Sequence, residues 1–592
     1  MKKLTAALTA AGMLLTCTIP ALPAMAEEQE FVYLGTETIG PLEFWGQSGT
    51  PEDAYYIVET CAEDAVEVEI PAEINGYPVV GISAWAFDGC EELTKVVMPD
   101  SIVSISFDAF ENCEKLADIT FSKNLEYVGH EAFEDTAWFE NQPDGVIYFG
   151  TLAYAYKFSE EDEFTVDLKE GTTTILSNFG NVQFGHTSDD HFLTLNIPAS
   201  VTEIDIDGGA ISPKCMALNV AEENENYASI DGVLFNKEKT DLLVYPMEME
   251  QSSYTIPDGV ENIAHRAFQG QGYLKEIVMS DSVETVESAA FMSMINLEKL
   301  TLSKNLKRIG ENAFAECFFL KQVEFPEGLE YIGQSAFAYC EALKEIHIPA
   351  SVTEMDSGVF RGCSALESLT VAEDNPRYEM RGDMLYDKQD MILKHCMNLD
   401  VMEMIVPEGT KDIDEHTFAG AAFTSVVIPE GVEVIRENVF FYCKNLTTID
   451  LPTTLTKVEE LAFDECDALT TINYAGTEEM WNAVEVENFF NDTFLAAKVN
   501  FGNQEPVIPE ASAGDVNADN AVDATDAAMI LVAAAAQGAG SAHGLTDAQA
   551  AAADVDGSGS FDATDAALVL QYAAYAGAGG TQTIKEFLAA NQ

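Results

Sequence analysis

The chain of 592 residues is poor in positive charge. It has 29 Lys and Arg against 101 Asp and Glu, which gives a formal net charge of −72. A surface of this sign repels phosphates, so electrostatic binding of nucleic acid or of an anionic membrane is not expected. Hydrophobic residues still make up 47% of the chain, far more than in a disordered protein. The composition predicts a folded, soluble protein with several domains or one elongated array.

Long apolar runs are also missing. The longest candidate lies at the N-terminus, where Met-Lys-Lys precedes an apolar stretch that ends near Leu15, and an Ala-Met-Ala sequence ends at Ala26. These are the three parts of a secretory signal peptide, and the stretch is too short to span a membrane. A lipidated Cys17 is the less favoured alternative. We expect residues 1–26 to be removed, the chain to be extracellular and no part of it to insert into a membrane.

Cysteine is scarce, and its spacing is informative. Ten of the 11 Cys remain after the predicted cleavage, and an even number in a secreted chain favours disulfides. Seven of them, however, follow a repeated Phe by three residues: Cys90, Cys113, Cys317, Cys340, Cys363, Cys443 and Cys466. One repeated position indicates one buried slot, which a free thiol fills well. We therefore favour buried thiols, with disulfides as the alternative.

Catalytic motifs are absent from the sequence. It contains no G-x-S-x-G, no P-loop and no Rossmann fingerprint. His186 and His191 flank two Asp without helical spacing, which indicates a loop, and the pattern H-E-x-x-H that begins at His130 fails because Glu134 replaces the second His. We predict a protein that is not an enzyme. A carboxylate pair joined only in space would escape this search, so an enzyme with an unrecognised site stays an alternative.

What the sequence does contain is a repeat of about 23 residues. Its phase is marked by Phe87, Phe110, Phe133, Phe268, Phe291, Phe314, Phe337, Phe360, Phe418, Phe440 and Phe463. In one unit, Ile346 and Ile348 alternate with His347 as in a half-buried strand, and Pro349 ends the strand. A unit this short cannot bury its apolar side chains alone, and stacked neighbours can. The period is typical of leucine-rich solenoids.

These units resemble the BspA-like leucine-rich repeat family over roughly residues 60–500, through phrases such as IPASVT followed by A-F-x-x-C. The resemblance implies an α+β repeat, a solenoid of short parallel strands at 66–502. We expect an N-terminal cap at 27–65, since a solenoid must cover its first open core. Residues 226–245 and 375–394 resemble the hairpin-bearing insertions of the family, and residues 150–215 keep the pattern only loosely.

The strands of such a solenoid present one residue per unit to solvent, and these residues form a candidate ligand face. At this position stand Val278, Thr301, Glu324, His347 and Thr370. In a solenoid they line one continuous face, which is the usual recognition surface. The row is poor in aromatic residues and offers no clear platform for stacking sugars. A protein- or glycan-binding face and a plain solvated face remain equally open.

A different pattern follows a Pro- and Ala-containing linker at 503–513. An acidic segment of twelve residues at 515–526 recurs at 554–565, and an apolar helix is predicted after each copy, at 527–537 and 566–576. Calcium prefers six to eight oxygen ligands, which a twelve-residue loop offers from positions 1, 3, 5, 7, 9 and 12. The candidate ligands are Asp515, Asn517, Asp519, Ala521, Asp523 and Asp526, then Asp554, Asp556, Ser558, Ser560, Asp562 and Asp565, with Ala521 and Ser560 through their carbonyls.

Two such loops with one helix each resemble a type I dockerin, here at 514–580 with a C-terminal tail at 581–592. The resemblance implies two calcium ions and, as partner, a cohesin domain of a scaffoldin. Asn520 replaces the usual Gly, and Ser558 replaces an acid, which is expected to weaken the second site. The family implies cohesin contacts, in either of two orientations about 180° apart, from Ala524, Thr525, Val532, Ala563, Thr564 and Gln571.

Together the two patterns predict a secreted, non-catalytic protein. Its dockerin would dock it, with calcium, onto a scaffoldin in a cellulosome-type complex for polysaccharide catabolism, at or near a bacterial surface. Its solenoid would bind a protein or a glycan that the sequence does not name. The alternatives are a surface adhesin that binds host or neighbouring-cell proteins, and a polysaccharide-acting enzyme.

Overall fold

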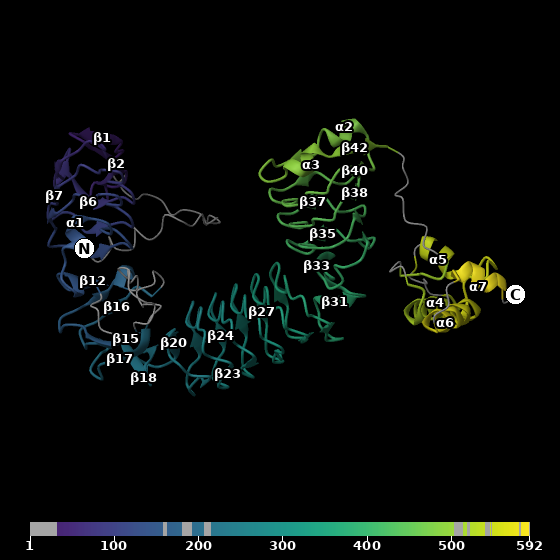
Figure 1. The fold of residues 1–592 in the computed structure, drawn as a ribbon. Coiled ribbons are helices and arrows are strands. Elements are labelled where there is room, and N and C mark those ends of the chain that lie inside the picture. The colour runs from purple at the N-terminus through teal and green to yellow at the C-terminus, as the bar shows by residue number, and fades with distance from the viewer. Residues whose placement is uncertain are drawn as a thin grey trace, which may run out of the picture. The chain divides into compact units, whose positions relative to one another are not determined.

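The computed structural model describes most of the chain (Figure 1), namely residues 32–157, 163–179, 192–206, 215–502, 513–517, 521–538, 545, 547–578 and 582–590. The predicted signal peptide, nearly all of the predicted linker, and His186 and His191 lie outside these residues. The chain forms two compact units. The first comprises Met1–Glu161, Leu168–Ser188 and Ser200–Ser212, and the second comprises Asp162–Asp167, Asp189–Ala199 and Pro213–Gln592.

The first unit begins with an antiparallel meander that continues into a parallel ladder. Its main sheet has the order β1 (Thr36–Ile39), β2 (Leu42–Gln47), β3 (Tyr55–Cys61), β6 (Tyr77–Ile82), β8 (Ser104–Ile105) and β10 (Tyr127–Val128), and β5 (Glu73–Ile74) pairs with β6. A parallel sheet is built from β4 (Glu67–Glu69), β7 (Lys95–Val97) and β9 (Asp118–Thr120). A third sheet follows α1 (Ala137–Glu140) and contains β11 (Gly145–Phe149), β12 (Leu152–Lys157), β14 (Thr174–Ile175) and β16 (Glu203–Ile204), with a short 3-10 turn at Ser177–Phe179.

The second unit continues the repeat with two kinds of short strand. The two-residue strands form most of a sheet ordered β18 (Tyr227–Ile230), β19 (Val233–Asn236), β20 (Asp241–Val244), β22 (Asn262–Ile263), β24 (Thr285–Val286), β26 (Arg308–Ile309), β27 (Tyr331–Ile332) and β29 (Glu354–Met355). The longer strands form separate parallel sheets: β13 (Glu163–Asp167) with β15 (Phe192–Ile197) and β17 (Cys215–Val220), β21 (Ser253–Thr255) with β23 (Glu276–Val278) and β25 (Lys299–Thr301), and β28 (Glu345–Ile348) with β30 (Ser368–Val371).

A hairpin at 378–396 begins the last part of the array. Its sheet is β31 (Tyr378–Arg381), β32 (Met384–Asp387), β33 (Ile392–Cys396) and β35 (Asp412–Ile413). Two parallel sheets follow, β34 (Glu403–Ile405), β36 (Ser425–Val427), β38 (Thr448–Leu451), β40 (Thr471–Tyr474) and β42 (Lys498–Phe501), and β37 (Val434–Ile435), β39 (Lys457–Val458) and β41 (Glu485–Val486). The short helices α2 (Glu478–Trp481) and α3 (Asp492–Ala496) belong to the final units.

The phased Phe residues form the centre of the core. All eleven are at most 1% exposed, and consecutive rings stack, with centroids 4.7 Å apart for Phe268 and Phe291 and 5.0 Å apart for Phe291 and Phe314. The backbone holds each ring from both sides: Ala289 and Ser293, two residues before and after Phe291, both have positive φ. The Phe291 N–H then donates to the Ala313 carbonyl of the next unit at 2.8 Å. Stacking and hydrogen bonding thus tie every unit to its neighbour.

The repeated cysteines occupy the slot that the sequence predicts. All ten Cys in the described residues are free, and eight of them are buried. In most repeats the thiol donates to the carbonyl of the phased Phe in the preceding unit, as from Cys317 to Phe291 at 3.3 Å and from Cys340 to Phe314 at 3.2 Å. A thiol suits this slot because it packs as a small apolar group and still satisfies a buried carbonyl.

Lysines on the solenoid surface pair across neighbouring units. Lys304 contacts Asp281 at 2.8 Å and Lys321 contacts Glu298 at 2.7 Å, each 23 residues away. The same spacing holds for six further pairs in the described residues, Lys95–Asp118, Lys115–Glu92, Lys123–Asp100, Lys299–Glu276, Lys307–Glu284 and Lys344–Glu367. The scarce cations therefore lie where they neutralise an acid of the adjacent unit.

The C-terminal module is helical. It contains α4 (Ala524–Gly538), α5 (Asp547–Ala553), α6 (Ala563–Gly577) and α7 (Ile584–Ala590). The helices α4 and α6 begin inside the predicted loops, three residues before the predicted apolar stretches. The segment predicted as a tail contains α7, whose Ile584 is buried in the module core. A Cβ on Gly514 would come within 2.6 Å of Ile584, so the close packing of α7 requires glycine there.

Candidate functional site

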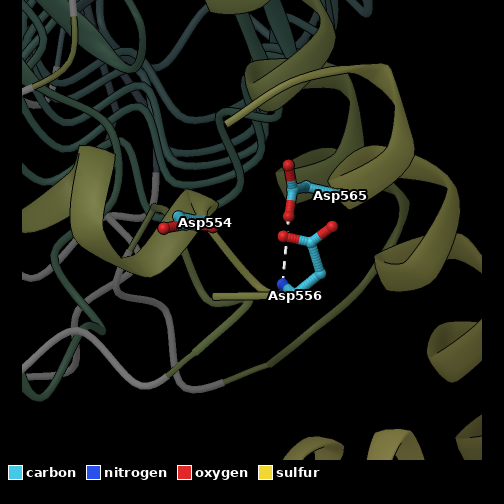
Figure 2. Close-up of side chains that lie close together, drawn as sticks. All are labelled: Asp554, Asp556 and Asp565. Carbon is cyan, nitrogen blue, oxygen red and sulfur yellow. Dashed lines mark hydrogen bonds between the residues drawn. The ribbon is translucent and has the colours of Figure 1, made fainter. Parts of the chain in front are cut away.

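The second acidic loop brings three carboxylates together. Oxygens of Asp554, Asp556 and Asp565 all lie within 4.8 Å of one another (Figure 2). Calcium is bound by protein oxygens at 2.3–2.6 Å, so ligands around one ion are separated by distances of this size. Asp554 and Asp556 come from the loop itself and Asp565 from the first turn of α6. The loop and the helix together therefore form a cluster of hard oxygen donors that fits calcium.

Asp565 is held rigidly although its side chain is fully buried. Its Oδ1 accepts the N–H groups of Val555 at 2.8 Å and Asp556 at 3.1 Å, and its Oδ2 accepts the N–H of Asp562 at 2.8 Å. Each carboxylate oxygen has a second lone pair for another partner. The carboxylate thus joins the start of the loop to the start of the helix, and it is orientated before any ion binds.

The remainder of the second loop turns around Asp554. Its two oxygens accept the N–H groups of Ser558 at 2.9 Å and Gly559 at 2.8 Å. Gly559, at loop position 6, has φ +88°, which a side chain would disfavour. Asp562 caps α6 by accepting the N–H of Thr564 at 2.6 Å, and this hydrogen bond lowers the pKa of the Asp562 carboxyl.

The first loop repeats this pattern of hydrogen bonds. Asp526 is fully buried and accepts N–H groups from Val516 at 2.7 Å, Asn517 at 3.1 Å and Asp523 at 2.9 Å. These are the same three loop positions that bind Asp565 in the second copy. The predicted ligand Asp519 and its neighbour Asn520 lie outside the described residues. The described positions of the first loop therefore match those of the second.

Both loops deliver an apolar side chain to one core. Phe561 is buried there, and Val522, at the same loop position of the first copy, packs against it while partly buried. Other members of the core come from α4 and α6, namely Ala527, Ile530, Ala533, Ala566 and Val569. Because both loops share this core, the positions of the two acidic clusters depend on the same packing.

The predicted cohesin-facing residues lie on the outside of the module. Ala524, Thr525, Ala563, Thr564 and Gln571 are exposed, and Val532 is 70% exposed. The structure adds two residues that the sequence argument missed, Leu531 and Leu570, which are 43% and 44% exposed. They occupy equivalent positions in the two copies, seven residues after Ala524 and Ala563, so the duplication itself could have identified them. Exposed leucines at matched positions give both helices a similar apolar patch.

The candidate ligand face of the solenoid is divided. Val278 pairs with Thr301 in one sheet, and His347 pairs with Thr370 in another, with 2.9 Å between the His347 Nδ1 and the Thr370 hydroxyl. Glu324 belongs to neither sheet, because the described segment 321–326 forms no strand. The inward position of that unit holds Phe325, whose larger ring stays only partly buried beside Phe337. The continuous face predicted from the period is therefore interrupted at Glu324.

The largest hollow of the second unit, about 580 Å³, lies beside the hairpin β31–β33. The cations that line it are ion-paired, Arg377 with Asp387 at 2.7 Å and Lys394 with Asp414 at 2.6 Å. A smaller hollow of about 160 Å³ includes Asp450, Asn473 and Asn500, whose side chains are hydrogen-bonded in a row at 2.6 and 2.8 Å. These contacts stabilise neighbouring units against one another.

The chain matches known families along most of its length. The family described as BspA type leucine rich repeat region matches in six copies over residues 80–207, 246–367 and 390–506, and the dockerin type I domain matches residues 513–572. The chain belongs to the BspA-type leucine-rich repeat family and carries a dockerin type I domain at its C-terminal end. No curated protein matches the chain. Among the described residues, no helix combines the length and apolar character needed to cross a membrane.

Several solved structures are similar to the chain. A leucine rich cell surface protein from Faecalibacterium prausnitzii is 20% identical, with 77% of this chain and 99% of that one covered and a TM-score of 0.31. The pneumococcal vaccine antigen PcpA is 17% identical, with 79% and 99% covered and a TM-score of 0.32. A leucine-rich repeat protein from Bacteroides ovatus is 22% identical, with 78% and 99% covered and a TM-score of 0.29. Similarities of this size say nothing about what this chain binds.

The two families define the kind of protein. A leucine-rich repeat solenoid and a dockerin are both non-catalytic kinds of fold. Type I dockerins bind calcium, and their partners are cohesins. The chain is therefore a repeat protein with a calcium-binding docking domain.

Proposed function

We propose that the chain is a secreted, non-catalytic component that docks onto a cohesin-bearing scaffoldin and presents its solenoid to a protein or glycan ligand. The observation that carries this proposal is the duplication in the C-terminal module. Two loops with the same hydrogen bonds each precede a helix that begins with the same exposed Ala-Thr pair. The setting is a cellulosome-type complex on or near a bacterial cell, where polysaccharide is degraded.

Two calcium ions bind the module in this proposal, one in each loop. In the second loop, Asp554, Asp556 and Asp565 supply carboxylate oxygens, and Ser558, Asp562 and the Ser560 carbonyl complete the set. In the first loop the corresponding residues are Asp515, Asn517, Asp519, Asp523 and Asp526, with the Ala521 carbonyl. Their support is the donor chemistry and the 4.8 Å spacing of the three carboxylates in the second loop. The ions would relieve the repulsion between these like charges.

The cohesin would contact the start of α4 or of α6. Ala524 and Thr525 have identical counterparts in Ala563 and Thr564, so a half-turn of the module presents nearly the same surface. Leu531 and Leu570 extend this likeness along the helices, whereas Val532 and Gln571 differ. An apolar contact fits the exposed leucines, since burying them on binding removes apolar surface from water.

The test is a titration of the chain beginning at Glu27 against a panel of type I cohesins, with Ca²⁺ and with chelator. We expect tight binding in Ca²⁺ only. Thr525→Arg or Thr564→Arg alone should leave the affinity within a few-fold, because one orientation survives, and the double variant should lose about 100-fold or more, the cost of losing a well-buried contact. Thr301→Arg on the solenoid is the control. Absence of binding to every cohesin would refute the docking proposal.

The ligand of the solenoid is a separate question with its own measurement. Screening the chain on a glycan array and against surface proteins of neighbouring and host cells would separate a glycan-binding component from an adhesin. Turnover on plant polysaccharides would instead establish the enzyme alternative. The pairing of His347 with Thr370 supports a polar contact site on β28 and β30, and His347→Ala should then weaken binding of whichever ligand is found.

A further inference from the structure

The cysteine of the first repeat has a different environment from the others. In later repeats the thiol donates to the carbonyl of the preceding phased Phe at 3.0–3.3 Å, as from Cys113 to Phe87 at 3.1 Å and from Cys466 to Phe440 at 3.0 Å. Cys90 follows Phe87, the first phased Phe, so no earlier one exists to accept from it. Its Sγ instead lies 3.6 Å from the Ala62 carbonyl oxygen and 4.0 Å from that of Cys61. The hydrogen bond typical of the slot is therefore not formed at its usual length.

A second thiol occupies the same place. Cys61 ends strand β3 of the N-terminal meander, and its Sγ lies 3.7 Å from the same Ala62 carbonyl oxygen. The two thiols also hydrogen-bond directly to each other. The Cys61 N–H donates to the Ala86 carbonyl at 2.7 Å, which fixes the end of β3 against the first repeat. Cys61 is half-exposed, whereas Cys90 is fully buried.

We propose that Cys61 and Cys90 are a disulfide-forming pair that locks the N-terminal cap onto the first repeat once the chain meets an oxidising disulfide outside the cell. The oxidant is a small-molecule disulfide such as oxidised glutathione. The two protein thiols lose their hydrogens and form one S–S bond, the S–S bond of glutathione breaks, and each glutathione sulfur leaves as a thiol. The half-exposed Cys61 is the sulfur that the oxidant reaches, and Cys90 completes the bridge from within.

The reactivity of the other cysteines is suppressed. Burial raises the pKa of Cys113 and of Cys317 to about 12, so their thiolates are scarce at neutral pH. The pKa of Cys90, by contrast, is lowered by the hydrogen bond from Cys61. Cys443 and Cys466 also contact each other, but both are fully buried and each donates to a Phe carbonyl, at 3.1 and 3.0 Å. The pair at the cap thus differs from the repeat cysteines in access, hydrogen bonding and acidity.

A bridge at this place would act on the end of the array. The first repeat has a neighbour on one side only, and the cap must cover its open core. Leu42, Phe44 and Val58 of the cap are packed in the same core cluster as Phe87 and Cys90. The bridge would hold that packing closed by restricting the unfolded chain between the two residues. Its benefit therefore lies in resistance to fraying from the N-terminal end.

The experiment treats the chain beginning at Glu27 with oxidised glutathione at neutral pH, alkylates it after denaturation, and maps its peptides without reduction. Of its ten thiols, we expect two to be protected and linked as Cys61–Cys90, which leaves ten minus two, or eight, to be alkylated. Oxidation should raise the midpoint of thermal unfolding of the chain. Cys61→Ser, at a half-exposed position, should abolish both results, and Cys113→Ser should preserve both.

Three outcomes would overturn the proposal. They are alkylation of all ten thiols, a bridge between other cysteines such as Cys443 and Cys466, and a lasting glutathione adduct on Cys61 beside an alkylated Cys90. The measurement does not depend on cohesin binding, so failure here leaves the docking proposal untouched, and the reverse also holds.

Discussion

The solenoid and the dockerin module are stabilised by opposite means. The solenoid buries a continuous stack of rings and leaves its charges outside, where Lys304 and Lys321 pair with acids of the next unit. The module has a small apolar core, and it buries the carboxylates of Asp526 and Asp565 completely. Repetition supplies the solenoid with new apolar contacts at every unit. The module lacks that source and needs a bound cation.

The difference shows where charge can be buried. A carboxylate inside a protein must be paired, coordinated or protonated, because its desolvation is costly. In the module, Asp565 has backbone N–H groups and two neighbouring carboxylates that together suit a cation. In the solenoid, Glu134 is buried next to Glu131 and Asp135, and it must solve the same problem by protonation. Four measurements would test or refine this contrast, and the largest effect is expected from removing calcium.

Chelation should unfold the module and spare the solenoid. Ligand at a thousand times its dissociation constant stabilises a folded state by about 4 kcal/mol per site, and the module has two proposed sites. Calorimetry of the whole chain in Ca²⁺ should show a module transition that chelator abolishes, while the solenoid transition stays in place. A module transition that is unchanged in chelator would refute the contrast between the two regions.

A ring inside the stack should matter more than any single surface group. Phe314→Ala should destabilise the solenoid by about 4 kcal/mol, since it leaves a cavity between Phe291 and Phe337. The matched control is Phe319→Ala, because Phe319 is 54% exposed and should contribute little. The solenoid transition in chelator, followed by circular dichroism, measures both variants. Equal midpoints for the two variants would contradict a core that depends on stacked rings.

The buried Glu134 should make the first unit sensitive to pH. Desolvation, with help from Glu131 and Asp135, raises the pKa of Glu134 from its ordinary 4.5 to about 8. The folded state then holds a proton that the unfolded state loses, so stability is greatest below pH 4.5 and falls as the pH rises to about 8.

Glu134→Gln should therefore stabilise the chain at pH 8 by about 2 kcal/mol and leave it unchanged at pH 4. The exposed Glu126→Gln is the control and should have no effect at either pH. Thermal unfolding at the two pH values gives the answer. A uniform effect of Glu134→Gln across that range would show that this carboxyl is ionised in the folded protein, contrary to its burial.

The surface ion pairs should have the smallest effect. Lys304 and Asp281 are well solvated, and such pairs contribute little because water and salt screen them. Lys304→Gln should leave the solenoid midpoint unchanged within error, in low salt and in high salt. A clear loss of stability in low salt only would indicate that the inter-unit pairs act together against the excess of negative charge.

The features that repeat could be predicted from the sequence, and those that occur once could not. The Phe positions, the cysteine slot and the paired acidic loops each announce themselves several times in register. The helix α7 does not, because Ile584 gains its meaning only through contact with the rest of the module core. The interruption at Glu324 depends on the size of one ring, Phe325. The proximity of Cys61 to Cys90 joins the cap to the array, and no period relates them.

The ion pairs between units also bear on how such an array changes in length during evolution. Every Lys that reaches 23 residues along the chain finds its acid only if the intervening stretch is one whole unit. Gain or loss of a complete unit by recombination preserves the charge pairing, the ring stack and the thiol slot at once, whereas a partial unit breaks all three. The array can therefore grow or shorten in steps of one repeat while the docking domain stays as it is.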